Sequence, residues 1–430
     1  MRYYSLNNRS HQVGFREATL GGQAPDKGLY FPSELPGLPS EFLARLAELP
    51  DAEIAYAVIR PYVGDAIPED ALRRIVEQTV SFPIPLVRID DSRYALELFH
   101  GPTLAFKDIG ARFMSRCLGH FVANRQKKIT VLVATSGDTG GAVADGFYGV
   151  EGVDVVILYP SGKVSSVQEK QLTTLGKNIR ALEVEGSFDD CQQMVKTAFL
   201  DKDLAGRFTL TSANSINVAR WLPQQFYYFF ALKQWPFEEP PVFSVPSGNF
   251  GNICAGLLAH LTGLPVRQFI AACNANAVVP AFMESGAYVP QKAIPTISNA
   301  MDVGDPSNFV RILELFRQNF PELKKRLGSI SVNDDQTKTT LLDVYRKHRY
   351  LLDPHGAVGY FALEQYLEKH PGERGIVLET AHPVKFYDVV EPLIGTPVEI
   401  PGQISAMLSR KKISVKIPAA FPALKAYLMD

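Results

Sequence analysis

The sequence predicts an α/β protein built on mainly parallel, twisted sheets that are flanked by helices. Short and nearly continuous apolar runs, such as ITVLVA at 129–134, alternate with longer segments of helical periodicity. Such runs indicate strands buried on both faces, which is typical of parallel sheets covered by helices. Polar turns that follow several of these strands add a third indication, because ligands of open α/β sheets bind at that edge.

The first ninety residues are expected to form a small, mostly helical N-terminal domain. The segment GLYFP at 28–32 suggests a loop and a short strand. Helices are expected over 40–49, 52–63 and 68–80, and Pro68 favours a helix start. Pro83 and Pro85 then mark a boundary, so we assign residues 1–90 to this domain.

The alternating pattern begins near residue 95 and defines the predicted catalytic core, residues 91–390, as two α/β subdomains. Strands are predicted at 95–99, 129–134, 153–159, 181–184, 208–210, 242–245, 268–272 and 376–379. Helices are predicted from 106, from 139, over 166–175 and over 187–200, where Ser187 and Asp190 resemble a capping box. A more polar, helical excursion is expected at about 290–350, and residues 391–430 are expected to form a C-terminal appendage.

The amino-acid composition limits the classes of partner and the cellular compartments that fit this protein. The 44 Lys and Arg residues against 45 Asp and Glu leave a formal net charge of −1, so there is no basic excess for nucleic acid or for a membrane surface. The N-terminus is polar, unlike a signal peptide, and no apolar run is long enough to span a bilayer. Four scattered cysteines indicate buried thiols in a reducing compartment. We therefore expect a cytoplasmic protein with a small-molecule substrate, as a monomer or a homodimer.

Lys107 lies in the stretch ELFHGPTLAFKDIG, residues 97–110, where a predicted helix begins just after a Gly-Pro break. An ammonium group among apolar neighbours at a helix start has its pKa lowered by desolvation and by the helix dipole. The neutral form is the one that attacks a carbonyl group, so Lys107 is a candidate nucleophile. The alternative is a surface lysine whose stem covers apolar neighbours.

Three turns between a strand and a helix offer groups that bind anions. In SVPSGNFGN, residues 244–252, the glycines allow successive backbone amides to converge beside a helix N-terminus, which suits a phosphate. In ATSGDTG, residues 134–140, the hydroxyls suit a carboxylate or phosphate, although Asp138 opposes an anion unless it points away or caps the helix. In TSANSINVAR, residues 211–220, Arg220 offers a bidentate fork.

Each turn also has an ordinary structural interpretation. Glycine-rich turns recur without a ligand, Thr-Ser-Gly-Asp-Thr is good capping chemistry, and an arginine in a first helical turn is often solvated. His100, His355 and His382 each lie beside Gly or Pro in a predicted loop and fit the rim of an active site. No pair of histidines has metal-ligand spacing and there is no G-x-S-x-G motif, so neither a metal site nor a serine triad is expected.

Taken in order, these motifs resemble the threonine synthase family, which comprises pyridoxal-phosphate enzymes of fold type II in the tryptophan synthase β-subunit superfamily. The resemblance runs from GLYFP through IPEDAL, ELFHGPTLAFKD, ATSGDTG, SANSIN, SVPSGNFGN, SNAMDV and DPHGAV to TAHPVKF, which contains Lys385. The pair HGPTLAFKD and ATSGDTG is typical of the long bacterial and fungal branch. The resemblance implies no residue roles between about 313 and 349 or after 397.

The resemblance implies roles for particular residues around a pyridoxal 5'-phosphate cofactor. Lys107 is implied as the catalytic lysine that binds the cofactor aldehyde, and Thr380 as the hydroxyl that faces the pyridine nitrogen. Asp138, where relatives of this fold type usually have Asn, is implied to contact the cofactor hydroxyl. The residues implied to hold the cofactor phosphate are Gly248, Asn249, Phe250, Gly251 and Asn252. Those implied to bind substrate are Thr135, Ser136, Gly137, Thr139, Asn214, Ser215, Arg220 and Lys163.

The implied activity is that of a lyase in threonine biosynthesis, which converts O-phospho-L-homoserine and water into L-threonine and phosphate by γ-elimination and β-addition. One alternative is a phospho-amino-acid lyase or a serine/threonine dehydratase on the same fold. A second alternative is a non-catalytic relative that retains only binding, against which an intact Lys107 argues.

Overall fold

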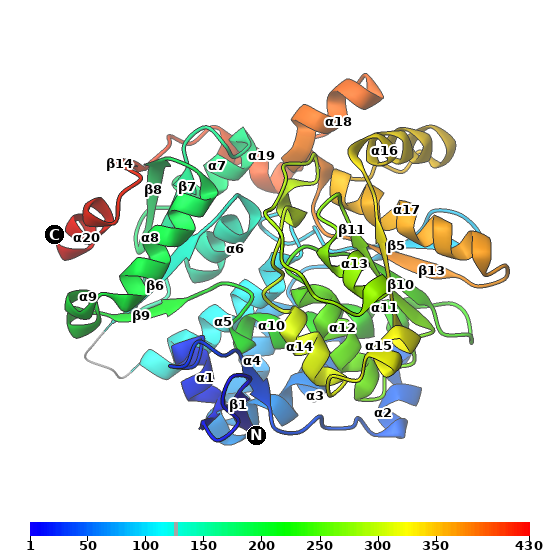
Figure 1. Cartoon of the computed structure of the whole chain (residues 1–430), viewed down its shortest axis with the longest axis horizontal. Coiled ribbons are helices and arrows are strands. Elements are labelled where there is room, and N and C mark those ends of the chain that lie inside the picture. Colours follow the sequence, from blue (N-terminus) through cyan, green and yellow to red (C-terminus); the bar gives the residue numbers. More distant parts are fainter. Residues whose placement is uncertain (124–127) are drawn as a thin grey trace.

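The computed structural model describes residues 1–123 and 128–430 and contains three sheets within them. A five-stranded sheet lies in one lobe and a six-stranded sheet in the other, with the N-terminal residues beneath both (Figure 1). The α/β class with mainly parallel sheets is therefore confirmed. None of the helices within the described residues has the length and apolarity that a membrane crossing requires.

The five-stranded sheet is parallel throughout and carries the first anion-binding turns at its carboxyl edge. Its strands, in spatial order, are β14 (Val415–Pro418), β8 (Ile179–Glu185), β7 (Val153–Pro160), β6 (Ile129–Ala134) and β9 (Thr209–Ser212). Every residue of β6 is buried, as its unbroken apolar run predicts. Its helices are α6 (Asp138–Phe147), α7 (Ser166–Thr173), α8 (Phe188–Leu200), α9 (Lys202–Arg207) and α20 (Phe421–Met429).

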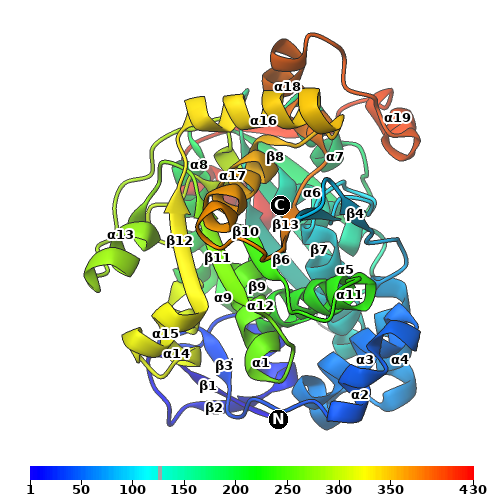
Figure 2. The ribbon, with the colours of Figure 1, turned by 90° about the vertical axis from the view of Figure 1, so that its right-hand side faces the viewer.

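The six-stranded sheet is parallel except at one edge, where β4 runs antiparallel to β5. Its order is β12 (Leu327–Ser331), β11 (Gln268–Cys273), β10 (Val242–Pro246), β13 (Gly375–Glu379), β5 (Arg93–Glu97) and β4 (Leu86–Arg88). Its helices are α12 (Gly251–Leu261), α13 (Val278–Ser285), α14 (Phe309–Leu315), α15 (Phe320–Arg326), α16 (Asp334–His348), α17 (Pro354–Lys369), α18 (Tyr387–Ile394) and α19 (Gly402–Leu408). Figure 2 shows α17 crossing this sheet.

The N-terminal region contains the predicted helices and, in addition, a small antiparallel sheet. The predicted helices correspond to α2 (Ser40–Ala44), α3 (Asp51–Val63) and α4 (Glu69–Thr79), and α1 (Phe15–Gly21) is a further helix where none was predicted. The sheet has the order β2 (Gln12–Gly14), β1 (Arg2–Ser5) and β3 (Tyr30–Pro32). Only β3 falls within a segment where the sequence suggests a strand, and the predicted helix at 40–49 becomes a short helix followed by a 3₁₀ turn.

Three further strands lie where none is predicted, and one of them is β4 at the antiparallel edge of the six-stranded sheet. The helical excursion at 290–350 contributes β12 to one edge of the six-stranded sheet, and the C-terminal segment contributes β14 to one edge of the five-stranded sheet. The capping box at Ser187 and Asp190 is confirmed, with both reciprocal hydrogen bonds present. The domain boundaries near 90 and 390 remain predictions.

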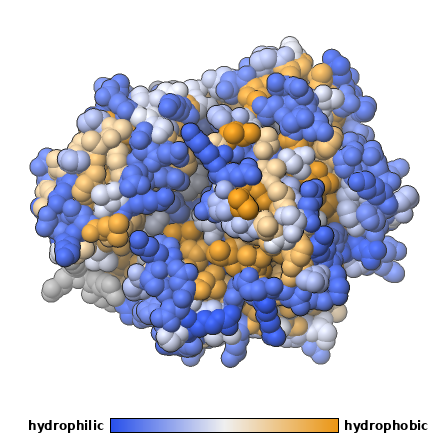
Figure 3. Space-filling model, in the orientation of Figure 1, coloured by the Kyte–Doolittle hydropathy of each residue, from blue (hydrophilic) through white to orange (hydrophobic). Residues whose placement is uncertain are grey.

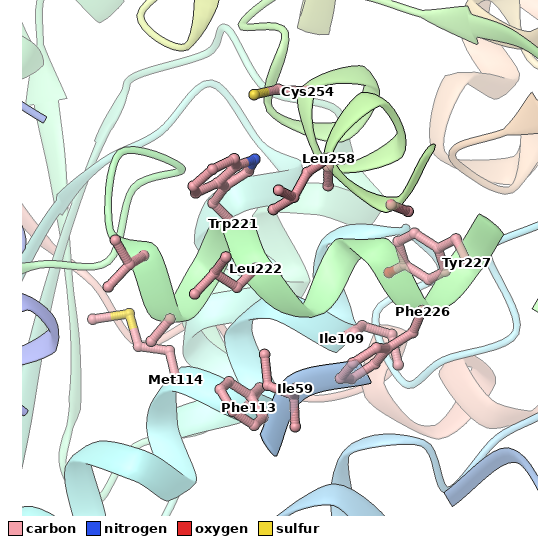
Figure 4. Packing of buried hydrophobic residues seen from close by; sticks show 14 of the residues in the cluster. Ile59, Ile109, Phe113, Met114, Trp221, Leu222, Phe226, Tyr227, Cys254 and Leu258 are labelled. Atoms are coloured by element: carbon pink, nitrogen blue, oxygen red, sulfur yellow. The ribbon is translucent and has the colours of Figure 1, made fainter. Parts of the chain in front are cut away.

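A helix between the two lobes places Lys107 and is held by a continuous apolar core. α5 (Lys107–Val122) begins at Lys107, and its buried side chains include Phe113 and Met114. Figure 4 shows these two side chains gathered with Leu222 and Phe226, from the segment that runs through α10 (Val218–Trp221) into α11 (Phe226–Gln234). Because this core fixes α5 along its length, the first residue of the helix is held in place.

Candidate active site

A cavity of about 1800 Å³ opens between the two lobes, and the corresponding face of the molecule is hollowed there (Figure 3). The turns that follow β6, β9, β10 and β13 all contribute to its wall. The carboxyl ends of parallel strands thus converge on one space, which is the arrangement expected for a ligand site in an open α/β protein.

This cavity brings together all but one of the site residues predicted from the sequence. Those that line it are Lys107, Thr135, Ser136, Asp138, Thr139, Lys163, Asn214, Ser215, Arg220, Gly248, Asn249, Phe250, Gly251, Asn252 and Thr380. Gly137, which was predicted to bind substrate, is not among the lining residues. A Cβ atom at Gly137 would lie 2.5 Å from Cδ of Gln168, so the side chain of Gln168 packs against it instead.

Lys107 lies in the first turn of α5, as predicted, although the helix begins at Lys107 itself rather than at Phe106, and its amine faces a carboxylate. Its Nζ lies 3.5 Å from Oδ2 of Asp138 and 4.9 Å from the ring centre of Phe106. Burial lowers the pKa of Lys107, Asp138 opposes that effect, and Lys385 and Arg220 lower the pKa further by charge repulsion. The site therefore shifts this amine toward its neutral form relative to a lysine in water.

Asp138 has two further partners besides Lys107. Because these partners neutralise and orient the carboxylate, it is tolerated among groups that suit anions. Its Oδ1 lies 2.9 Å from Nζ of Lys385 and accepts a hydrogen bond of 2.9 Å from Nε2 of Gln168. Burial acts to raise the pKa of Asp138, but Lys385 and Lys107 outweigh it and hold that pKa well below its usual range. The sequence indicated Lys385 only as part of the motif TAHPVKF, and it gave no indication that Gln168 belongs to the site.

The turn after β10 forms a cradle for an anion at the start of α12. Phe250 adopts a left-handed conformation with φ of 60° immediately before the helix. Because a phenylalanine side chain cannot accept hydrogen bonds, it leaves the first amides of α12 available. Gly248 must be glycine, since a Cβ atom there would lie 2.7 Å from Cα of Met301.

Two buried donors in the cavity wall lack partners among the described residues. Asn252 accepts a hydrogen bond of 2.6 Å from the hydroxyl of Tyr228, but its Nδ2 is unpaired. Arg220 donates from Nη1 to the carbonyl of Ala213, but its Nε is unpaired, and burial lowers its pKa to about 10. Buried donors are normally satisfied, so both are candidates to bind a ligand in this cavity.

The turn that carries Asn214 and Ser215 is held from behind by a buried arginine that sequence reasoning missed. Arg311, in α14, donates to the carbonyls of Ser215 and Ile216 and also to the carbonyl of Tyr30 in β3. Its guanidinium lies 4.4 Å from the ring centre of Trp221. The N-terminal sheet is thereby tied to the wall of the site.

Only one of the three histidines expected at the rim lines the cavity. His355, in the first turn of α17, lies with Nδ1 2.5 Å from Oδ2 of Asp353, while its Nε2 accepts from the backbone amide of Ala300 at 3.1 Å. His100 and His382 do not line the cavity; the nearest ring to His382 is that of Phe99, with centroids 5.2 Å apart.

Comparison with known protein families assigns this site to a class. A family model described as pyridoxal-phosphate dependent enzyme matches residues 82–379, which include the lysine, the cradle and Thr380. The phosphate cradle, the unpaired donors and the buried amine of Lys107 fit that cofactor. The fold and site thus define a pyridoxal-phosphate-dependent enzyme of fold type II.

More specific models and relatives narrow the class. Models described as threonine synthase N terminus and threonine synthase, C-terminal match residues 2–80 and 356–428. The chain is 44% identical over 431 residues to threonine synthase of Serratia marcescens. The alignment covers 100% of this chain and 99% of that protein. The chain belongs to the threonine synthase family, as its motifs indicated.

Solved structures agree with this assignment over the whole chain. The crystal structure of threonine synthase from Escherichia coli superposes with a TM-score of 0.93 at 43% identity, covering 100% of this chain and 99% of that one. The structure of pyridoxal-phosphate-bound threonine synthase from Brucella melitensis also gives a TM-score of 0.93, at 36% identity, covering 100% and 98%. A threonine deaminase from Solanum lycopersicum, at 17% identity and a TM-score of 0.57, shares the fold alone.

Proposed function

We propose that this protein converts O-phospho-L-homoserine and water into L-threonine and phosphate, with Lys107 as the catalytic lysine. The observation that supports the proposal is that one cavity is lined by two groups of hydrogen-bond donors that suit anions. The cradle at 248–252 suits the phosphate of the cofactor, and Arg220 with its unpaired Nε suits a second phosphate. A substrate that carries its own phosphate accounts for the second site.

Pyridoxal phosphate, when bound, supplies an aldehyde that amines attack and a ring that withdraws electrons from the substrate Cα–H bond. Burial lowers the pKa of Lys107, and its Nζ is proposed to accept the proton from Cα and to return protons at later steps. Thr380 offers a neutral hydroxyl to the ring nitrogen, and Asp138 is proposed to face the cofactor hydroxyl. Thr135, Ser136 and Thr139 are proposed to hold the substrate carboxylate, with Gly137 in the same turn.

We assign Arg220 the central role in substrate selection, because it is a buried arginine in the wall of the cavity. Asn214 and Ser215 add neutral hydrogen-bond groups beside it, and Lys163 adds a charge at the cavity wall. A substrate without the phosphate leaves these buried donors unpaired, which costs roughly several kcal/mol. Selectivity for a phosphorylated amino acid follows.

The test is incubation of the purified protein and cofactor with O-phospho-L-homoserine, with assays for phosphate and threonine together. Equal release of both supports the proposal, whereas 2-oxobutyrate and ammonia would identify a lyase or dehydratase. Borohydride reduction of the loaded protein is expected to fix the cofactor on Lys107, and a modified peptide from elsewhere would contradict the assignment. Protein that stays colourless with the cofactor would indicate a non-catalytic relative.

We further propose that the protein works in the cytoplasm as a monomer or a homodimer. All four cysteines, Cys117, Cys191, Cys254 and Cys273, are buried and unpaired, which supports a reducing compartment. Light scattering after size exclusion measures the mass in solution directly, and a tetramer or larger assembly would contradict this proposal.

A further inference from the structure

A second lysine lies closer to Asp138 than Lys107 does. Lys385 belongs to the 3₁₀ turn Pro383–Phe386 after β13, and none of its surface is exposed. Its Nζ lies 2.9 Å from Oδ1 of Asp138 and donates to the carbonyl of Thr103 at 2.8 Å. Lys107 Nζ lies 3.5 Å from the other carboxylate oxygen, Oδ2. One buried carboxylate therefore lies between two lysines.

This arrangement ranks the two lysines as partners of Asp138. Two ammonium groups and one carboxylate would leave a net positive charge in a buried site, which is costly. Lys385 has a carboxylate and a carbonyl as close acceptors, whereas Lys107 has only the longer contact. Lys385 is therefore the stronger partner of Asp138, and Lys107 is left with the weaker contact.

The other charged groups around these lysines do not reverse that order. Arg220 faces Lys107 and repels a second positive charge there. Asp108 acts electrostatically on Lys385, but its carboxylate accepts hydrogen bonds from the amide and hydroxyl of Thr103. Gln168, the remaining partner of Asp138, is neutral and only orients the carboxylate.

We propose that Lys385 is a positioning residue that serves as the permanent counter-ion of Asp138 and thereby keeps the amine of Lys107 neutral. Without Lys385, Asp138 would pair with Lys107 and stabilise its ammonium form, which neither attacks an aldehyde nor accepts a proton. The inference rests on the proposed function only in taking Lys107 as the reactive amine.

The test measures the protonation of Lys107 directly, on the full chain prepared without cofactor. Competitive labelling with acetic anhydride at a series of pH values, read by mass spectrometry, gives the pH at which Lys107 is half reactive. In Lys385→Met this pH is expected to rise by about one unit or more, so labelling below it falls roughly tenfold. Lys385→Arg keeps the charge and is expected to stay closer to wild type.

Lys233→Met is the matched control, because it removes a lysine from an ion pair with Asp51 outside the cavity and is expected to change nothing at Lys107. An unchanged or lower half-reactive pH in Lys385→Met would overturn the proposal. If that variant does not fold, Asp138→Asn takes its place: removing the shared anion must lower the half-reactive pH of Lys107, and a rise or no change would overturn the proposal.

A second readout uses the cofactor itself. The rate at which pyridoxal phosphate becomes fixed on Lys107 by borohydride is expected to reach half its maximum at a higher pH in Lys385→Met than in wild type. Neither measurement involves the amino-acid substrate. A failure to form threonine would therefore count against the proposed function and leave this inference intact, and the converse also holds.

Discussion

Arg220 is a buried side chain whose hydrogen-bonding capacity is only partly satisfied within the protein. Its guanidinium is fully buried, has no carboxylate at hydrogen-bond distance, and leaves Nε unpaired among the described residues. Burying such a group is unfavourable unless a ligand completes its hydrogen bonds. The position is therefore explained by an anionic substrate better than by stability.

We expect Arg220→Ala to weaken binding of O-phospho-L-homoserine about a hundredfold and to leave homoserine binding nearly unchanged, since charge-assisted hydrogen bonds contribute roughly 1.5–3 kcal/mol. Spectral titration of the loaded protein with both compounds gives the two dissociation constants. Arg207→Ala, at the exposed end of α9, is the control. Equal losses for both compounds would remove Arg220 from the phosphate site.

Asp108, the residue after Lys107, makes the stability of the folded protein depend on pH. Its carboxylate accepts hydrogen bonds from Thr103, but complete burial raises its pKa to about 6, against an unfolded value of about 3.9. The folded state therefore binds more protons between these values. The stability that this carboxyl contributes is full below about pH 4 and is lost as the pH rises through about 6.

We expect Asp108→Asn to remove this dependence, because an amide does not ionise. Relative to wild type, the variant is expected to gain up to about 2–3 kcal/mol in the free energy of unfolding between pH 4 and pH 7.5. Denaturant unfolding at both pH values measures the change. A wild-type protein that becomes more stable relative to the variant across this interval would contradict the raised pKa.

At the scale of elements, the site depends on how closely separate segments approach the cradle. The turn 248–252 joins β10 to α12, and the segment that contains Met301 packs directly over it. This contact joins a short glycine motif to a segment about fifty residues further along the chain. The shape of the cradle is therefore a property of two elements together.

We expect Gly248→Ala to lower the affinity for pyridoxal phosphate at least tenfold, because the new Cβ would lie 2.7 Å from Cα of Met301 and must push the backbone aside. The matched control is Gly402→Ala at the start of α19, where nothing lies within 4 Å of the added atom. Absorbance titration with the cofactor compares the two variants. Similar affinities would show that the segment yields without distorting the cradle.

At the scale of the whole molecule, the chain returns to the five-stranded sheet after it has completed the six-stranded sheet. β14 pairs in parallel with β8, and α20 packs on α8 (Figure 1). Leu424 of α20 is fully buried in the same cluster as Leu182 and Met194. The last residues thus cover an apolar face of the five-stranded sheet and stabilise the lobe that carries Asp138.

We expect Leu424→Ala to lower the free energy of unfolding by about 2–5 kcal/mol through lost burial and a cavity. Val415→Ala, in β14 at a side chain that is 45% exposed, is expected to cost less than about 1 kcal/mol. Thermal melting of both variants makes the comparison. A small effect at Leu424 would mean that the C-terminal segment adds little to the lobe.

The sequence by itself determined the fold class, the central strands and the turns that form the site. Strands such as β6 and β10 are buried on both faces, so their apolar runs are visible without any knowledge of their neighbours. The edge strands β4, β12 and β14 were not predicted, because an edge strand is short and partly exposed and forms only when a distant partner supplies its hydrogen bonds.

Only the tertiary structure decided how charge is distributed in the site. Sequence motifs indicated Lys107, Asp138 and the anion-binding turns, but the strength of a charge depends on burial and on neighbours within a few ångströms. Lys385 lies 278 residues from Lys107 in the chain and yet shares its carboxylate partner. Arg311 joins the N-terminal sheet to the turn at 214–216 in the same way. Local sequence patterns do not predict such contacts, because these residues are distant in the chain and meet only in the folded protein.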